Sequence, residues 1–70
     1  MERILVTSTD IHSVGYDVDS QVLEVEFHKG GTYQYFNVPQ HIYDDLMVSE
    51  SKGKYFNLHI KKAGFSYSRI

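Results

Sequence analysis

The stretch that decides the fold is VLEVEFHKGGTYQY, residues 22–35. Its first half alternates apolar and acidic residues, which is the period-two pattern of a β-strand with one buried face. The apolar positions are Leu23, Val25 and Phe27, and Glu24 and Glu26 lie between them. Two glycines then turn the chain, and a second strand runs back over residues 32–37. The stretch therefore predicts an antiparallel hairpin.

The length of the turn decides where Tyr33 and Tyr35 point. A two-residue turn at Lys29 and Gly30 would place both tyrosines opposite the glutamates, on the solvent face. A three-residue turn over residues 28–30, with Gly30 left-handed, would place them opposite Val25 and Leu23. A shift of one residue moves every side chain of a strand to the other face.

We favour the three-residue turn, because a chain of 70 residues has a thin core. Burying one large apolar side chain stabilises a fold by about 1.5–3 kcal/mol. A core without Tyr33 and Tyr35 would lose much of that stabilisation. Both tyrosines are therefore predicted to be mainly structural.

The rest of the chain predicts an α+β domain. Residues 11–16 are expected to form a strand with His12, Val14 and Tyr16 on one face, followed by a turn at residues 17–20. A helix is expected to begin with Pro39 in its first turn, and a second helix to begin after a capping Ser51 and to end at Gly64. The predicted fold is a three-stranded antiparallel β-meander followed by two helices packed on one face, with an extended C-terminal tail.

Residues 1–70 are expected to form a single domain, with residues 1–10 as a loosely ordered or short-strand lead-in. The chain has no cysteine, so disulfides and thiolate metal sites are excluded. No segment is long and apolar enough to predict a membrane span or a signal peptide. We expect a cytoplasmic protein with no cofactor and no bound metal.

Charge is segregated along the chain. Residues 1–50 carry nine acidic side chains and only Arg3 and Lys29 as basic ones, a net charge of −7. Residues 51–70 carry five basic side chains and no acidic one. This pattern predicts either an anionic partner for the C-terminal part or an electrostatic match between the two halves.

No catalytic motif stands out. His41 and Asp45 are one helical turn apart, but two ligands make a weak metal site. His59 shares the predicted apolar side of the second helix with Phe56 and Ile60, so it is expected at the core or its edge. We therefore predict that the protein is not an enzyme.

The second predicted helix carries the candidate binding residues. Its N-terminus would attract anions, Gly53 would allow a close approach to the backbone, and lysines flank it. Lys54 and Lys61 would lie about 10 Å apart along the helix axis. The predicted nucleic-acid-binding residues are Lys52, Gly53, Lys54, Asn57, Lys61, Lys62 and Arg69. The alternative is a solvated basic helix face with no ligand.

The chain resembles the KTSC domain family, from about residue 11 to residue 70. The matching stretches are Ser13-Val14-Gly15-Tyr16-Asp17, Leu23-Glu24-Val25-Glu26-Phe27, Tyr33-Gln34-Tyr35 with Val38-Pro39, and Ser51-Lys52-Gly53-Lys54-Tyr55-Phe56-Asn57 with Ile60. This small domain is found alone in bacterial and phage proteins and at the C-terminus of some lysyl-tRNA synthetases. The resemblance implies RNA binding and brings no catalytic residues with it. The Asp44-Asp45 pair and the acidic balance of the chain depart from that expectation.

Three functions follow in order of preference. The first is a non-enzymatic module that binds RNA or another anionic polymer through the basic C-terminal helix. The second is a protein–protein interaction module. The third is a small hydrolase that uses His59 or His41.

Overall fold

The central hairpin has the register that places both tyrosines on the apolar face. In the computed structural model, which describes residues 1–70, β3 (Val22–Phe27) pairs antiparallel with β4 (Gly31–Tyr35). Val25 lies opposite Tyr33, and Leu23 lies opposite Tyr35. The predicted three-residue connection is confirmed. The left-handed residue is Gly31, with φ of 84°, and not Gly30 as expected, so the positive φ falls on the first residue of β4, after the three turn residues.

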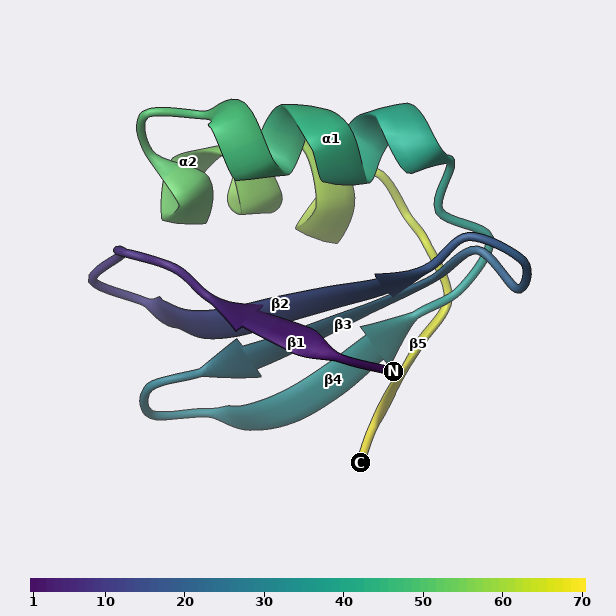
Figure 1. Cartoon of the computed structure of the whole chain (residues 1–70), viewed down its shortest axis with the longest axis horizontal. Coiled ribbons are helices and arrows are strands. Elements are labelled where there is room, and N and C mark those ends of the chain that lie inside the picture. The colour runs from purple at the N-terminus through teal and green to yellow at the C-terminus, as the bar shows by residue number, and fades with distance from the viewer.

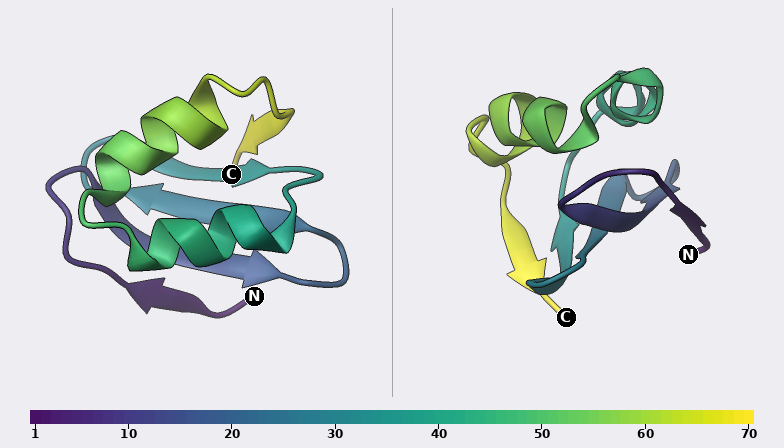
Figure 2. Two further views of the ribbon diagram at one scale, coloured as in Figure 1. Left: turned by 90° about the horizontal axis from the view of Figure 1, so that it is seen from above. Right: turned by 90° about the vertical axis from the view of Figure 1, so that its left-hand side faces the viewer.

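The sheet has five antiparallel strands rather than three, in the order β1-β2-β3-β4-β5 (Figure 1). The three predicted strands are present, since β2 (Ile11–Asp17) pairs with β3. The two additional strands are β1 (Arg3–Leu5), in the predicted lead-in, and β5 (Tyr67–Arg69), in the predicted tail. They form the two edges of the sheet (Figure 2). Each is only three residues long, so neither produces a periodic signal that identifies a strand.

A β-bulge in β2 changes which of its side chains face the core, so the predicted facing of His12 is wrong. The register shifts between Ile11 and Ser13, which leaves His12 as the extra residue. Ile11 is therefore buried in the core together with Val14, whereas His12 is only half-buried. The prediction placed His12 on that face because strict alternation does not allow for an inserted residue.

Both helices pack on one face of the sheet, as predicted (Figures 1 and 2). α1 (Gln40–Val48) contributes Leu46 to the core, and α2 (Lys52–Phe56) contributes Phe56. Pro39 is the N-cap residue of α1 and precedes its first turn. The prediction placed Pro39 one position too late. Proline has no backbone N–H group, so at the N-cap position, as in the first turn, it adds no unpaired donor.

The second helix does not stay α-helical to its end. After Phe56 it continues as η1, a π-helix over Asn57–Lys61, in which the Lys62 N–H donates to the Asn57 carbonyl at 3.2 Å. Phe56 and Ile60 are both buried, as expected, but His59 is exposed and lies against the Tyr55 ring at 4.4 Å between centroids. The expectation of a core or core-edge histidine is therefore wrong. The wider π-turn changes which side chains face the sheet.

The opposite face of the sheet carries a polar cluster. Arg3 Nη1 donates to Glu24 Oε2 at 2.8 Å, and Gln34 Nε2 donates to the other oxygen of the same carboxylate at 2.9 Å. Ser13 donates to Glu26 at 2.9 Å. Glu24 is buried on this face because these partners cover it and satisfy its carboxylate. The cluster links strands β1 to β4.

No helix of the structure is long and apolar enough to span a lipid bilayer.

Candidate nucleic-acid interface

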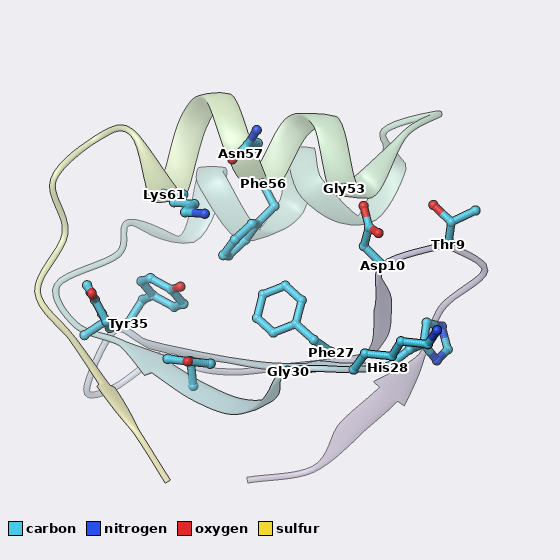
Figure 3. A pocket seen from close by; sticks show the side chains of 13 residues that line it. Thr9, Asp10, Phe27, His28, Gly30, Tyr35, Gly53, Phe56, Asn57 and Lys61 are labelled. Carbon is cyan, nitrogen blue, oxygen red and sulfur yellow. The ribbon is translucent and has the colours of Figure 1, made fainter.

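A groove opens between the second helix and one side of the sheet (Figure 3). It has a volume of about 930 Å³ and is lined from α2, η1, β3, the β3–β4 turn, β4, β5 and the loop before β2. Its aromatic lining residues are Phe27, Tyr33, Tyr35, Phe56 and Tyr67. Its remaining lining residues are Thr9, Asp10, His28, Lys29, Gly30, Gly53, Asn57 and Lys61. A concave surface that combines aromatic and polar groups is the usual form of a ligand site.

The floor of the groove is a continuous aromatic cluster. Phe56 lies edge-on to Phe27 and Tyr35, with centroid distances of 5.2 Å and 5.4 Å. Figure 3 shows these three rings converging on the space between helix and sheet. Tyr33 extends the cluster from Phe27 at 6.0 Å toward β5. Edge-to-face pairs of this kind each add about 0.5–1.5 kcal/mol beyond the buried area.

Tyr67 is the exposed end of that cluster. Its ring lies 5.5 Å from that of Tyr35 and 6.0 Å from that of Tyr33, yet 63% of the residue is open to solvent. Tyr35, in contrast, is 6% exposed. One side of the Tyr67 ring is thus held by its neighbours, and much of the rest is accessible.

The hydroxyl of Tyr35 remains protonated at neutral pH. Burial raises the pKa of this phenol above its ordinary value of 10.0, and the neighbouring Tyr67 and Tyr33 phenols raise it further. The Tyr35 hydroxyl is therefore an uncharged group that can donate or accept a hydrogen bond.

Three basic side chains flank the aromatic floor. Lys29 comes from the β3–β4 turn and Lys61 from η1, and Figure 3 shows Lys61 reaching over the space above the sheet. The Arg69 guanidinium lies 6.0 Å from the centre of the Tyr33 ring, in the range of a cation–π contact. It also lies over Gly31, where an added Cβ would be 2.8 Å from one of its nitrogens.

The structure divides the predicted site residues between several places. Gly53, Asn57 and Lys61 line the groove, and Arg69 flanks it. Lys52, Lys54 and the other side of Gly53 line a second hollow of about 440 Å³, against residues 7–10 and residues 50–51. Lys62 is exposed and lines neither. The predicted basic surface is therefore not one continuous face.

Gly53 has a close neighbour that sequence reasoning did not foresee. A Cβ at this position would lie 2.9 Å from Asp10 Oδ2, so the absence of a side chain allows a carboxylate of the chain itself to come close. The predicted anion-binding position therefore already faces a negative charge.

Sequence reasoning missed Lys29, Phe27, Tyr67 and the two tyrosines of β4 as groove residues. The one sequence signal for these groove residues lies in the tail, where Tyr67 and Arg69 are two residues apart, as side chains on one face of a strand are. That signal becomes informative only once the tail is paired with β4. Tyr33 lies opposite Arg69 and Tyr35 opposite Tyr67.

The histidines form no metal centre. The rings of His12 and His28 meet edge-on at 5.1 Å, and His28 Nε2 lies 3.1 Å from the Ser8 carbonyl oxygen. No cluster of three or more potential ligands from His, Asp and Glu side chains occurs in the structure. His41 and His59 are both exposed and lie outside the groove.

The fold and the groove define a small α+β domain in which two helices and an edge strand enclose an aromatic cluster. The KTSC domain family model matches residues 7–65. The chain belongs to the KTSC domain family, which confirms the resemblance seen in the sequence.

Similar proteins agree with this assignment. The crystal structure of a KTSC domain protein from Yersinia pestis is 40% identical and superposes with a TM-score of 0.94, covering 99% of this chain and 96% of that one. A protein of Stutzerimonas stutzeri (strain A1501) is 39% identical over 100% of this chain and 99% of its own length. A lysine–tRNA ligase of Nostoc punctiforme is 41% identical over 73% of this chain, which corresponds to only 9% of the ligase.

Proposed function

We propose that this domain is a non-enzymatic binding module that binds RNA in the aromatic groove. One observation carries the proposal. Lys61 and Lys29 line the groove, and Arg69 flanks it, from three different elements around an aromatic floor. Cations attract the phosphate backbone, and rings accept bases, so the two kinds of group together fit a nucleic acid better than they fit a purely apolar ligand.

The relatives support the class of ligand. Segments of lysine–tRNA ligases resemble this chain over about a tenth of the length of those proteins. A similar segment that forms part of a lysine–tRNA ligase lies in a protein whose name gives tRNA as its substrate, and this favours RNA as the ligand class. The contact surface proposed here differs from the predicted basic helix, because Gly53, Asn57 and Lys61 are the only predicted binding residues of that helix that line the groove.

A salt titration of RNA binding tests the proposal. Affinity for tRNA is expected to fall as salt rises, with a logarithmic slope that reflects the number of phosphate groups that the protein neutralises. The double variant Lys61→Glu plus Arg69→Glu is expected to bind more weakly. Its slope is expected to be shallower, by about one for each phosphate group that the variant no longer neutralises.

The matched control is the double variant Lys54→Glu plus Lys62→Glu. It changes the net charge by the same amount but alters residues that do not line the groove. It is expected to keep most of the affinity. Equal losses of affinity in both double variants would contradict the groove as the site and favour the helix surface. No binding of RNA to the unaltered domain at low salt would remove the proposal.

A second candidate is a protein-interaction module, favoured by the free edge of β5. The Phe36 N–H donates to the Ser66 carbonyl and the Ile70 N–H donates to the Thr32 carbonyl, so these residues face β4. By the alternation of an antiparallel ladder, the backbone groups of Tyr67 and Arg69 point away from β4 and could pair with an added strand. Binding of a defined protein that persists after nuclease treatment would support this candidate.

The proposal leaves a hydrolase that depends on His59 or His41 as the least favoured function. Both are solvent-exposed, and His59 lies against Tyr55 rather than beside a catalytic partner. A hydrolytic activity that disappears in the His59→Ala variant would contradict the non-enzymatic assignment.

A further inference from the structure

We infer that the groove selects single-stranded RNA, and that the exposed ring of Tyr67 stacks on an unpaired base. This inference rests on the proposed function and names the form of RNA that the site accepts. It concerns Tyr67 in particular, because this is the groove ring that neighbouring side chains leave most open to solvent.

The position of Tyr67 suits a stacking platform. The rings of Tyr33 and Tyr35 hold it from within the cluster, at 6.0 Å and 5.5 Å, so its orientation is set before any ligand arrives. It belongs to β5, the edge strand, so no further strand covers that side. A supported ring with an accessible face can accept a base without first being ordered, which lowers the entropic cost of binding.

Positive charge lies where the backbone of a stacked nucleotide would run. Arg69 is two residues beyond Tyr67 on the same strand, and both lie opposite the tyrosines of β4. Two residues span about 7 Å along a strand. Lys61 faces the same groove from η1. A base on Tyr67 thus places its phosphates within the field of two cations from different elements.

A duplex would not use these groups together. Its bases are stacked on one another and present only their edges, so their faces cannot lie on a side chain. Tyr67 lines the groove and is largely exposed, so its ring belongs to a concave site rather than to a flat basic surface. An unpaired base can leave its stack and enter such a groove, and stacking alone discriminates little between base types.

The decisive measurement uses the fact that the chain contains no tryptophan. The Tyr67→Trp variant therefore carries a single tryptophan, at the proposed stacking position, which can be excited apart from the tyrosines. Its emission is expected to be quenched by a single-stranded oligoribonucleotide of about 10 nucleotides, a length within the site sizes of small single-strand-binding folds. The matching duplex and inorganic polyphosphate are expected to quench it little.

Leu58→Trp is the matched control. Leu58 is 54% exposed, comparable to Tyr67, but it does not line the groove. Its emission is expected to change little with any of the three polymers. Equal quenching at both positions would mean that the reporter responds to nonspecific association, and it would overturn the inference.

Affinity measurements supply the second readout. Tyr67→Leu is expected to weaken single-strand binding by about 5- to 150-fold, the range for loss of one base–aromatic stack, whereas Tyr67→Phe keeps the ring and most of the affinity. The domain should remain folded in both variants, because most of Tyr67 is already in contact with water.

The two proposals fail in different ways. Equal binding of single strand and duplex, unchanged in Tyr67→Leu but weakened in Lys61→Glu plus Arg69→Glu, would overturn the stacking inference and leave RNA binding in place. Absence of binding to every RNA would remove both. Binding of polyphosphate as tight as that of single-stranded RNA would also overturn a role for bases.

Discussion

Replacing Gly15 by alanine tests how tightly β1 is held against the sheet. Gly15 lies opposite Arg3 in the β1–β2 ladder and is buried. A Cβ at this position would lie 2.8 Å from the Glu2 carbonyl oxygen, 3.1 Å from Arg3 Cγ and 3.2 Å from Met1 Cγ. The nearest of these atoms belongs to the backbone and cannot rotate away. The substitution must therefore displace β1.

The expected cost follows from two opposing effects. Insertion of a methyl group into a packed site costs about 1–3 kcal/mol, whereas replacing glycine restricts the unfolded chain and returns about 0.4–1 kcal/mol. The net decrease in the free energy of unfolding for Gly15→Ala therefore lies between about 0 and 2.6 kcal/mol, and we expect the upper half of that range because the nearest atom belongs to the backbone. In a domain of this size each kcal/mol lowers the melting temperature by about 4–8 °C.

Urea unfolding followed by circular dichroism measures this decrease, with Gly30→Ala as the matched control. At Gly30 an added Cβ would come no closer than 3.5 Å to Phe27 Cβ, which is an ordinary van der Waals distance, and φ is not left-handed. Gly30→Ala is expected to be neutral or slightly stabilising. Equal unfolding midpoints for the two variants would refute the reasoning about β1.

The ion pair between β1 and β3 provides an independent check on the same displacement. Arg3 Nη1 and Glu24 Oε2 are 2.8 Å apart, and the Glu24 side chain is only 11% exposed. A hydrogen bond to a charged group contributes about 1.5–3 kcal/mol. If Gly15→Ala moves β1, then Arg3→Ala should cost less in that background than in the unaltered protein. Strictly additive decreases in stability would show that β1 had not moved.

Two further predictions concern backbone conformation and ionisation. Gly64, where the second helix stops, has φ of 86°, and no atom lies within 4 Å of an added Cβ. Gly64→Ala should therefore lower the free energy of unfolding by about 1–2 kcal/mol through backbone conformation alone, as measured by urea unfolding. An unchanged stability would contradict the left-handed stop. Because the pKa of Tyr35 is raised in the folded state, its contribution to stability is complete below pH 10.0 and disappears as pH rises toward the raised pKa. Unfolding midpoints should therefore fall as the pH rises above 10.0, and less so in Tyr35→Phe, which cannot ionise. Identical pH profiles would contradict the prediction.

The alternating residues of β3 were enough to predict the hairpin, its register and the helix-covered face. The three-residue turn followed because only that register gathers Tyr33 and Tyr35 with Val25 on one surface. The stop at Gly64 and the two helices were predicted equally well from local signals. These features depend on short periodic patterns, whose energetic cause is burial of one face of a strand or helix.

The candidate site could not be predicted in the same way. The groove gathers side chains from the β3–β4 turn, β4, the second helix and β5, and β5 pairs with β4 across more than thirty intervening residues. Nothing local in the tail distinguishes a docked strand from an extended segment, because its pairing is stabilised by distant partners rather than by its own sequence.

Local patterns thus determined the three strands β2, β3 and β4, the two helices and the apolar face of the central hairpin. Tertiary structure alone decided that the chain end becomes an edge strand, that β2 bulges at His12 and that the second helix widens at Asn57. The physical reason is that an inserted residue or a remote pairing is selected by the fit of the whole core. That fit also separates the predicted lysines and brings Lys61 and Arg69 beside the rings.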